Sequence, residues 1–245
     1  TKVKLMPKEL YDPKSTFVYD AETPPRVFAS PQRYIQGAGV VDRSGHYIKE
    51  VMKVTRAGIL ASARGHHSEG DRVATSLNSC SMSHLRMVFE GECSSLEIEK
   101  HVASMRSERI DCLIAVGGGK VADAGKCIAH RLDVPVVIVS SLASTDAPCS
   151  ALSVVYTPHG TTDHVEFFPK NPDIIIVDTD IIAKAPERHL VAGMGDAMAT
   201  WYEASVCLNN PSARNAHGAL PTLASCAIGE ICARTLFDYG ELAAK

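Results

Sequence analysis

The sequence predicts an α/β protein, with a parallel sheet in its N-terminal part and an all-helical part after it. Apolar runs at 111–116 and 136–140 flank a helix-forming segment at 119–131. Such a strand–helix–strand unit is typical of a parallel sheet that is buried on both faces. Beyond residue 186 the spacing of apolar residues is helical, with no strand candidate. An α/β layered domain followed by a helical one is therefore expected.

The first elements are predicted from apolar periodicity and turn residues. We expect short edge strands at Val27–Ala29 and Tyr34–Gln36, and then a helix within Val41–Thr55 whose apolar residues share one face. A strand at Ile59–Ala61 precedes a loop rich in glycine, histidine and serine and a helix around Asp71–Ser79.

The alternation of strands and helices continues to the last predicted strand. Leu85–Phe89 is predicted as a strand, and Ser94 with Glu97 indicates the start of the next helix. Ile174–Val177 is the final strand candidate, and Pro186 stands where the helical part begins.

Three segments are predicted from these elements. Residues 1–25 mix lysines with acidic residues and are expected to form an extended arm. Residues 26–186 form the α/β domain, and residues 187–245 form the start of a helical domain that we expect to be incomplete at Lys245.

Composition excludes several classes of protein. The 25 basic and 28 acidic residues give a net charge of −3, so the chain lacks the basic field of a nucleic-acid-binding protein. The longest apolar runs, at 134–139 and 174–177, are too short for a membrane helix. None of the eight cysteines forms a Cys-x-x-Cys pair, and several lie in apolar segments. We therefore expect a soluble, cytoplasmic protein with buried free thiols.

A glycine-rich turn after the strand at 111–116 carries the first chemical signal. Gly117, Gly118 and Gly119 allow a ligand to approach the backbone closely, and the helix that follows presents its positive N-terminus to the same point. Lys120 adds a charge there. The turn matches neither G-x-G-x-x-G nor the P-loop pattern. It is either a phosphate-binding loop or a tight turn that binds nothing, and its place in a strand–helix–strand unit favours phosphate.

Four motifs occur along the chain in the order Gly117-Gly-Gly-Lys-Val-Ala-Asp123, Ser144-Thr-Asp-Ala-Pro148, Ser150-Ala-Leu-Ser-Val-Val-Tyr156 and Gly193-Met-Gly-Asp196. Together they resemble those of the glycerol dehydrogenases, in the iron-containing alcohol dehydrogenase superfamily. The resemblance covers residues 26–245, and Tyr34–Gly37 and Gly91–Ser94 are further matches.

The resemblance implies a dinucleotide-binding α/β domain, a helical domain and a metal in the cleft between them. It places Asp146 against the hydroxyl groups of the substrate and makes Asp196 a ligand of the metal, Zn²⁺. It expects the other two ligands, both histidines, downstream of Lys245. The residues that it assigns to NAD are Gly118, Gly119, Lys120, Asp123, Ser141, Ser144, Ser150, Leu152 and Tyr156.

The implied activity is the NAD-linked, zinc-dependent oxidation of glycerol to dihydroxyacetone. In that reaction a Lewis-acidic metal lowers the pKa of the substrate hydroxyl, and the cofactor takes up hydride. The expected partner is a small polyol, with no nucleic acid or membrane. A homo-oligomer is expected because an exposed half-domain favours association.

The residues alone leave other roles open. Ser144 and Asp146 suit a polyol and equally suit a turn in which they cap backbone amides. For Asp196 the residues alone favour a helix-capping acid, and only the resemblance makes it a metal ligand. His189 lies roughly 10 Å along a helix from Asp196, too far for shared coordination. His217 is expected to be exposed. The other histidines, His130, His159 and the loop pair His66-His67 among them, are expected to be solvated or to cap backbone groups.

One segment departs from the family pattern. The family places an acidic residue after the second sheet strand to hold the adenosine ribose, whereas 59–67 contains Ser62 and Arg64 and no acid. An arginine there accommodates the 2′-phosphate of NADP, or simply faces solvent. Two alternatives to the implied enzyme also remain: a catalytically silent nucleotide-binding fragment, and a related dehydrogenase acting on another small alcohol or diol.

Overall fold

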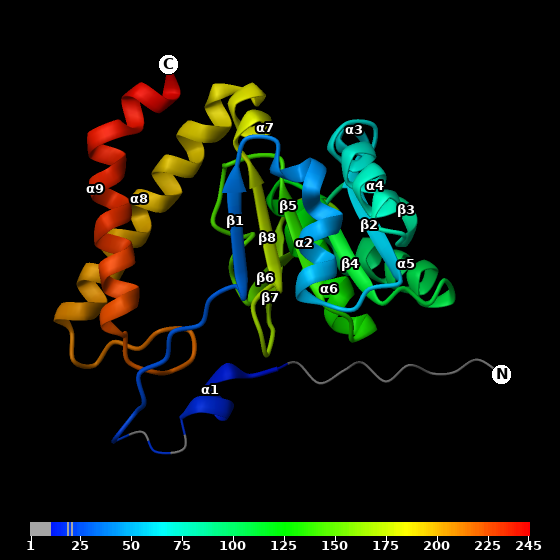
Figure 1. Ribbon diagram of the computed structural model, residues 1–245. Helices are drawn as coiled ribbons and strands as arrows, with labels where there is room; N and C mark the ends of the chain where they lie inside the picture. The colour runs from blue at the N-terminus through cyan, green and yellow to red at the C-terminus, as the bar shows by residue number, and fades with distance from the viewer. Residues whose placement is uncertain (1–10, 19, 21) are drawn as a thin grey trace.

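The structure, a computed structural model, describes residues 11–18, 20 and 22–245 and is built around one six-stranded parallel sheet (Figure 1). The strand order is β1-β8-β5-β4-β2-β3, and every neighbouring pair is parallel. This sheet confirms the predicted α/β class. The strands are β1 (Arg33–Gly37), β2 (Arg56–Ser62), β3 (Ser83–Phe89), β4 (Cys112–Gly117), β5 (Val136–Ser140) and β8 (Ile174–Asp178).

Helices cover both faces of the sheet, which explains why its central strands are apolar throughout. In β4, Leu113 and Ala115 belong to one core cluster, while Ile114 and Val116 belong to the cluster on the other face. The first cluster includes residues of α5 (Ser95–Ser107) and α6 (Gly119–Leu132). The second includes residues of the 3₁₀ helix η1 (Val40–Arg43), α2 (Ser44–Val51), α4 (Glu69–Ser79) and α7 (Thr179–Lys184).

One predicted strand is absent, and one predicted helix is shorter than the segment assigned to it. Val27–Ala29 is not a strand: Arg26 forms only an isolated bridge to Leu220, and the Val27 amide donates to the Leu220 carbonyl instead of joining the sheet. The helix expected within 41–55 is α2, which ends at Val51 so that the following residues can lead into β2.

The extended arm predicted at 1–25 is also corrected. Residues 13–17 form a short helix, α1 (Pro13–Phe17), because Asp12 caps it by accepting a hydrogen bond from the Lys14 amide, and Pro13 occupies its first position. The part of the predicted arm at residues 1–10, 19 and 21 lies outside the described residues.

A hairpin that was not predicted from the sequence packs on α6. Strands β6 (Leu152–Tyr156) and β7 (Thr162–Phe167) pair antiparallel, and alternate residues of β6 are buried. The sequence does contain a strand signal, because the β-branched and aromatic run Val154–Tyr156 is followed by the turn residues Pro158 and Gly160. The motif at 150–156 therefore forms a strand beside the sheet.

The last part of the described chain consists of two long helices, as predicted. Helix α8 (Glu187–Asn209) and helix α9 (Leu223–Ala244) lie side by side along much of their length (Figure 1). Helix α8 begins at Glu187, directly after Pro186, but the domain boundary placed there stays a prediction. In the described ranges we found no helix that is both long and apolar enough to cross a membrane.

A buried ion pair ties β7 to α6. The Glu166 carboxylate, 3% exposed, accepts hydrogen bonds of 3.0 and 2.6 Å from the two Nη atoms of Arg131. His164 Nε2 lies 3.2 Å from the same carboxylate. Burial alone would raise the pKa of Glu166, but the hydrogen bonds and charges of Arg131 and His164 outweigh it and lower that pKa.

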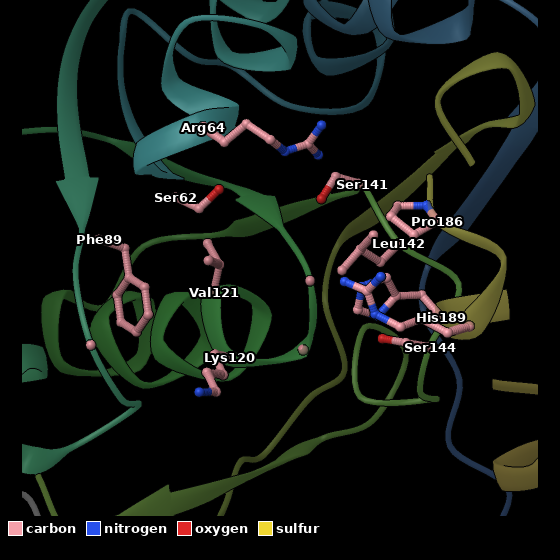
Figure 2. A pocket seen from close by; sticks show the side chains of 14 residues that line it. Ser62, Arg64, Phe89, Lys120, Val121, Ser141, Leu142, Ser144, Pro186 and His189 are labelled. Atoms are coloured by element: carbon pink, nitrogen blue, oxygen red, sulfur yellow. The ribbon is translucent and has the colours of Figure 1, made fainter. Parts of the chain in front are cut away.

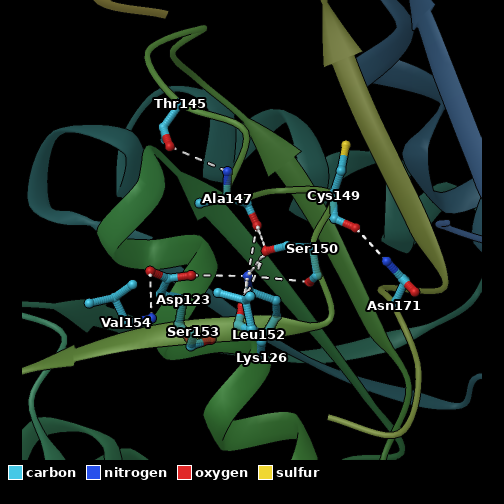
Figure 3. Close-up of polar contacts among 10 residues, drawn as sticks. All are labelled: Asp123, Lys126, Thr145, Ala147, Cys149, Ser150, Leu152, Ser153, Val154 and Asn171. Atoms are coloured by element: carbon cyan, nitrogen blue, oxygen red, sulfur yellow. Dashed lines mark hydrogen bonds and ion pairs between the residues drawn. The ribbon is translucent and has the colours of Figure 1, made fainter. Parts of the chain in front are cut away.

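A second buried contact joins α6 to the chain after β5. Lys126 is 3% exposed, and its ammonium donates to the carbonyls of Ala147 (2.7 Å) and Leu152 and to Ser150 Oγ (3.1 Å) (Figure 3). Its Nζ is also 3.0 Å from Asp123 Oδ1. One cation therefore fixes the loop before β6 against the helix that follows the glycine turn.

Asp123 completes this network from the first turns of α6. Its Oδ2 accepts a hydrogen bond from the Val154 amide, and its carbonyl accepts one from Ser153 Oγ, so it binds β6 directly (Figure 3). Burial raises the pKa of Asp123, and the ammonium of Lys126 opposes that shift. Removing Lys126 therefore leaves a buried carboxylate without its counter-charge.

We predict that Lys126→Met lowers the free energy of unfolding by about 3–5 kcal/mol, because one member of a buried ion pair is left uncompensated. Lys120→Met on the same helix is the control, since Lys120 is exposed and pairs with Glu92 at the surface. It should cost less than about 1 kcal/mol. Urea denaturation of both variants measures the difference, and equal losses would contradict the role given to Lys126.

We predict that Glu166→Gln destabilises the protein by about 2 kcal/mol at pH 7, through the loss of charge-assisted hydrogen bonds. Because the folded-state pKa lies below the ordinary value of 4.5, the stabilisation is complete above about pH 4.5 and is lost as the pH falls through the folded-state pKa. Denaturation of wild type and variant from pH 7 to pH 3.5 should show the two converging. Asp163→Asn, at an exposed carboxylate on the same strand, is the comparison. Asp163 contacts His164 Nδ1 at 3.1 Å, so the change removes one surface pair and should cost less than about 1 kcal/mol at any pH.

Candidate functional site

The candidate site is a cleft of about 610 Å³ at the carboxyl ends of β2, β4 and β5 (Figure 2). Open α/β sheets bind ligands at this edge. Its other wall is the start of α8. The cleft is lined by Ser62, Arg64, Phe89, Gly91, Gly118, Gly119, Lys120, Val121, Ser141, Leu142, Ser144, Pro186, Arg188 and His189.

The glycine turn forms the floor of the cleft. Gly118 is the N-cap of α6, so the first amides of the helix point to this place without acceptors inside the helix. A Cβ at Gly119 would lie 2.9 Å from Thr145 Cγ2, and one at Gly118 would lie 3.1 Å from Leu142 Cδ1. The glycines therefore let the loop after β5 approach the helix N-terminus while the backbone stays open to a ligand.

The charge of the cleft suits an anion. Among the described residues that line it, Arg64, Lys120 and Arg188 are cationic and none is a carboxylate. Lys120 Nζ donates to Glu92 Oε1 at 2.5 Å, outside the lining. Ser141 is buried in the wall, and Ser140 Oγ just before it is buried without a hydrogen-bond partner among the described residues. The donors and cations fit the phosphates and hydroxyls of a dinucleotide.

The two predicted carboxylates, fifty residues apart in sequence, meet beside this cleft. The backbone amide of Asp146 donates to Asp196 Oδ2 at 2.9 Å. Each is close in sequence to a lining residue, Asp146 to Ser144 and Asp196 to His189. Desolvation raises the pKa of Asp146 although the residue keeps contact with solvent, and the negative charge of Asp196 raises it further.

A close backbone contact fixes the position of α8, which carries Asp196, relative to the loop that carries Asp146. A Cβ at Gly193 of α8 would lie 2.1 Å from the carbonyl oxygen of Ala143, so only glycine allows the helix to rest on this loop. Because Gly193 is one turn before Asp196, the contact fixes where that carboxylate lies. The Gly193–Asp196 motif thus has a packing function as well as the predicted chemical one.

Five of the nine residues assigned to the cofactor line the cleft, namely Gly118, Gly119, Lys120, Ser141 and Ser144. The other four are not among the residues that line the cleft. Asp123 and Ser150 bind Lys126, the Leu152 carbonyl accepts from the same ammonium, and Tyr156 packs against the core. Their contact with a cofactor stays a prediction. Phe89, Leu142, Pro186 and Arg188 also line the cleft, although none of them was predicted as a site residue. Phe89 and the start of α8 reach the cleft only through the tertiary fold.

The histidines do not complete a metal site with Asp196. Within the described part of the chain, no group of three or more His, Cys, Asp or Glu side chains is placed to hold a metal ion. His217 is half-buried, contrary to expectation, because its ring packs edge-on against Phe17 of α1, and burial lowers its pKa.

Two further histidine expectations are corrected. His130 is half-buried beside Phe168, because it lies where α6 meets the segment after β7. His66 belongs to the short helix α3 (Ala63–His66) rather than to a loop, since Ser62 caps that helix by accepting from the Gly65 amide. His159, in contrast, is exposed as expected.

The chain is similar in sequence to a known family and to curated proteins. Residues 31–179 match the family described as iron-containing alcohol dehydrogenase. The chain is 41% identical over 220 residues to a glycerol dehydrogenase of Thermotoga maritima, covering 88% of this chain and 58% of the relative. It is 40% identical over 222 residues to a glycerol dehydrogenase of Escherichia coli, covering 89% and 59%.

A solved structure agrees with these relatives. The crystal structure of glycerol dehydrogenase from Schizosaccharomyces pombe superposes with a TM-score of 0.83 at 36% identity, over 91% of this chain and 56% of that one. The chain thus spans somewhat over half the length of the relatives it matches. On the match of 31–179, the chain belongs to the iron-containing alcohol dehydrogenase family.

Proposed function

We propose that the cleft binds a nicotinamide dinucleotide, NAD in the first instance, and that the protein containing this chain oxidises a small polyol, glycerol, to its ketone, dihydroxyacetone. The observation that carries the proposal is a cleft lined by the glycine turn and the hydroxyl-rich loop after β5, with the Asp146–Asp196 contact directly beside it. Two relatives, 41% and 40% identical to this chain, are named glycerol dehydrogenases, which supports glycerol as the substrate.

The residues of the cleft divide the work of orienting the cofactor. The backbone at Gly118 and Gly119 would donate hydrogen bonds to the pyrophosphate, and Lys120 would add a positive charge beside it. Ser141 and Ser144 offer hydroxyls further along, and Leu142 supplies an apolar surface. When bound, the nicotinamide supplies the acceptor for the hydride that leaves the substrate carbon. Contacts from Asp123, Ser150, Leu152 and Tyr156 remain part of the proposal.

Asp146 is proposed to bind the substrate. A polyol offers several hydroxyl donors, and an ionised carboxylate is a strong acceptor for them. Asp196 fixes the Asp146 backbone, so the two acids would present one acceptor edge next to the nicotinamide end of the cleft. This arrangement orients the carbon to be oxidised and needs no protein nucleophile.

Zinc is proposed as the metal by resemblance alone, with Asp196 as one of its ligands. A catalytic zinc site needs three protein ligands. The described residues do not fit a complete site of this kind, since no group of three is placed to hold an ion. We therefore derive no catalytic step through zinc, and the histidine ligands expected after Lys245 stay a prediction.

Three other features are proposed: the location, the oligomeric state and the domain boundary. The eight cysteines are all free thiols, which suits a reducing, cytoplasmic location. A homo-oligomer is proposed because α8 and α9 expose large apolar side chains such as Tyr202 and Phe237. A domain boundary near residue 186 is proposed because strands stop and long helices begin there.

We predict that Gly118→Val weakens NADH binding at least about tenfold, because the side chain would displace the pyrophosphate from the helix N-terminus. Gly195→Val is the matched control, since a Cβ there meets nothing within 4 Å and Gly195 does not line the cleft. Fluorescence titration with NADH, together with the thermal midpoint of each free protein, makes the comparison. Unchanged NADH affinity in a folded Gly118→Val protein would overturn the cofactor site.

We predict that Asp146→Asn raises the KM for glycerol roughly ten- to a hundredfold, because a charged acceptor for substrate hydroxyls is lost. The contact with Asp196 survives this change, since it uses the backbone amide of Asp146. NADH affinity should therefore remain as in wild type. Asp163→Asn provides a control at an exposed carboxylate on β7. An effect on NADH affinity alone would remove Asp146 from the substrate site.

The activity assay itself uses the naturally occurring protein that contains this chain. NADH formation is followed with glycerol, 1,2-propanediol and simple primary alcohols as substrates. A clear preference for glycerol supports the proposal, and a preference for another alcohol favours a related dehydrogenase. NADH binding without oxidation of any alcohol, with metal supplied, would favour a catalytically silent nucleotide-binding protein.

A further inference from the structure

We propose that the adenosine end of the cleft accepts a 2′-phosphate, so that NADP(H) is bound at least as tightly as NAD(H), with Arg64 as the residue that confers this specificity. The inference rests on the proposed function, because it requires the cleft to hold a dinucleotide. It concerns a different end of that cleft from the one used in catalysis.

The positions of the strands identify the adenosine end. The glycine turn follows β4, which lies between β5 and β2 in the sheet. The Asp146–Asp196 contact belongs to the β5 side, so the reacting end of a dinucleotide lies there. With its pyrophosphate at Gly118, the adenosine must extend to the other side, past the end of β2. Figure 2 shows Ser62 and Arg64 on that side of the cavity and His189 on the opposite side.

The end of β2 lacks the group that selects against a 2′-phosphate. Dinucleotide folds that prefer NAD place a carboxylate there, which binds the ribose hydroxyls and repels a phosphate. Here β2 ends in Ser62, and none of the described residues lining the cleft is acidic. A neutral hydroxyl at this place can bind a ribose but gives no electrostatic penalty against an added phosphate.

Arg64 is placed to bind that phosphate. Its side chain is 69% exposed, and its one ion pair among the described residues is a long contact of 3.7 Å with Glu69. It lines both the main cleft and a smaller adjoining pocket of about 210 Å³. A guanidinium that is not already tightly paired can form two parallel hydrogen bonds to a phosphate.

The smaller pocket adds further positive charge. Lys184 lines it, is exposed, and makes no ion pair with any other described residue. Arg72 lines it too, but its guanidinium is held by Asp42 at 2.7 Å and by the buried Asp178 at 3.2 Å. Arg64 and Lys184 are therefore the cations available to a ligand.

Glu69 is the one acid in the lining of the smaller pocket and must be accounted for. Its carboxylate is 8% exposed and accepts a hydrogen bond from Ser68 Oγ. It is therefore turned into the protein, at the start of α4, and it does not line the main cleft. The net charge that a 2′-phosphate would meet at this end, from Arg64, Lys184 and Glu69, remains positive.

Competitive binding tests the inference without any measurement of catalysis. NADH and NADPH are titrated by fluorescence against the wild-type protein and Arg64→Gln. We expect wild type to bind NADPH at least as tightly as NADH. In Arg64→Gln the affinity for NADPH should fall roughly ten- to a hundredfold, as a charged hydrogen-bonding group is lost, while that for NADH changes less than about threefold. Arg64→Lys, which keeps the charge but not the fork, should lie between.

Two probes restrict the measurement to the adenosine end. From wild type, adenosine 2′,5′-bisphosphate should displace NADH more effectively than 5′-AMP does. From Arg64→Gln, the bisphosphate should displace NADH no better than 5′-AMP does. Arg33→Gln, at an exposed arginine on edge strand β1, controls for a general loss of positive charge. Because Arg64 is largely exposed, its variants should keep the wild-type thermal midpoint.

The outcomes separate the inference from the proposed function. If NADH binds while NADPH binds more than about threefold more weakly, or if Arg64→Gln leaves the ratio of the two affinities unchanged, the 2′-phosphate site is wrong and the dinucleotide cleft stands. If neither dinucleotide binds to the folded protein, both are overturned.

Discussion

The ammonium of Lys126 is the constraint on which much of the site depends. A buried cation must be surrounded by acceptors, because an unpaired charge is very costly away from water. Here the acceptors come from Asp123 on the same helix and from the chain between Ala147 and Leu152 (Figure 3). Satisfying one side chain therefore fixes the end of the loop after β5, the start of β6 and the helix that carries the glycine turn.

This constraint places the predicted chemical groups at the rim of the cleft. The chain between Ser141 and Ala147 is anchored by β5 at one end and by Lys126 at the other. Its middle part lies over Gly119 and against Gly193, where additional side-chain atoms would collide with it. Asp146, next to Ala147 at the end of this segment, is thus held against α8, where its backbone amide donates to Asp196. The hydrogen bonds of Lys126 therefore also fix the position of the candidate site.

Charge is distributed unevenly along the cleft. Arg64 and Lys120 line the part that runs from the end of β2 past the glycine turn, whereas the third cation, Arg188, lies in the α8 wall. The two carboxylates lie beside the cleft, on its β5 side. The phosphates of a cofactor would be attracted by the cations in the first part. The hydroxyls of an uncharged polyol would find hydrogen-bond acceptors in the second. This polarity agrees with a phosphate-rich cofactor and a polyol, and it gives the cleft a direction.

The sequence by itself determined the class of the fold and most of its parallel sheet. Continuous apolar runs such as 112–117 require burial on both faces, and the glycine turn after that strand requires a close approach of backbone or ligand. Local signals also placed helix starts correctly, as at Ser94, whose side chain accepts from the Glu97 amide. These features depend on residues that are near one another in the chain.

Only the tertiary structure decided how distant groups meet. Nothing local to Asp123 distinguishes a carboxylate that binds a cofactor from one that balances Lys126, because the hairpin that covers both begins almost thirty residues later. The half-burial of His217 likewise depends on Phe17, two hundred residues earlier. Contacts of this kind follow from how the layers pack. The order of residues fixes the local conformations, while packing decides which side chains share a cavity and which are enclosed.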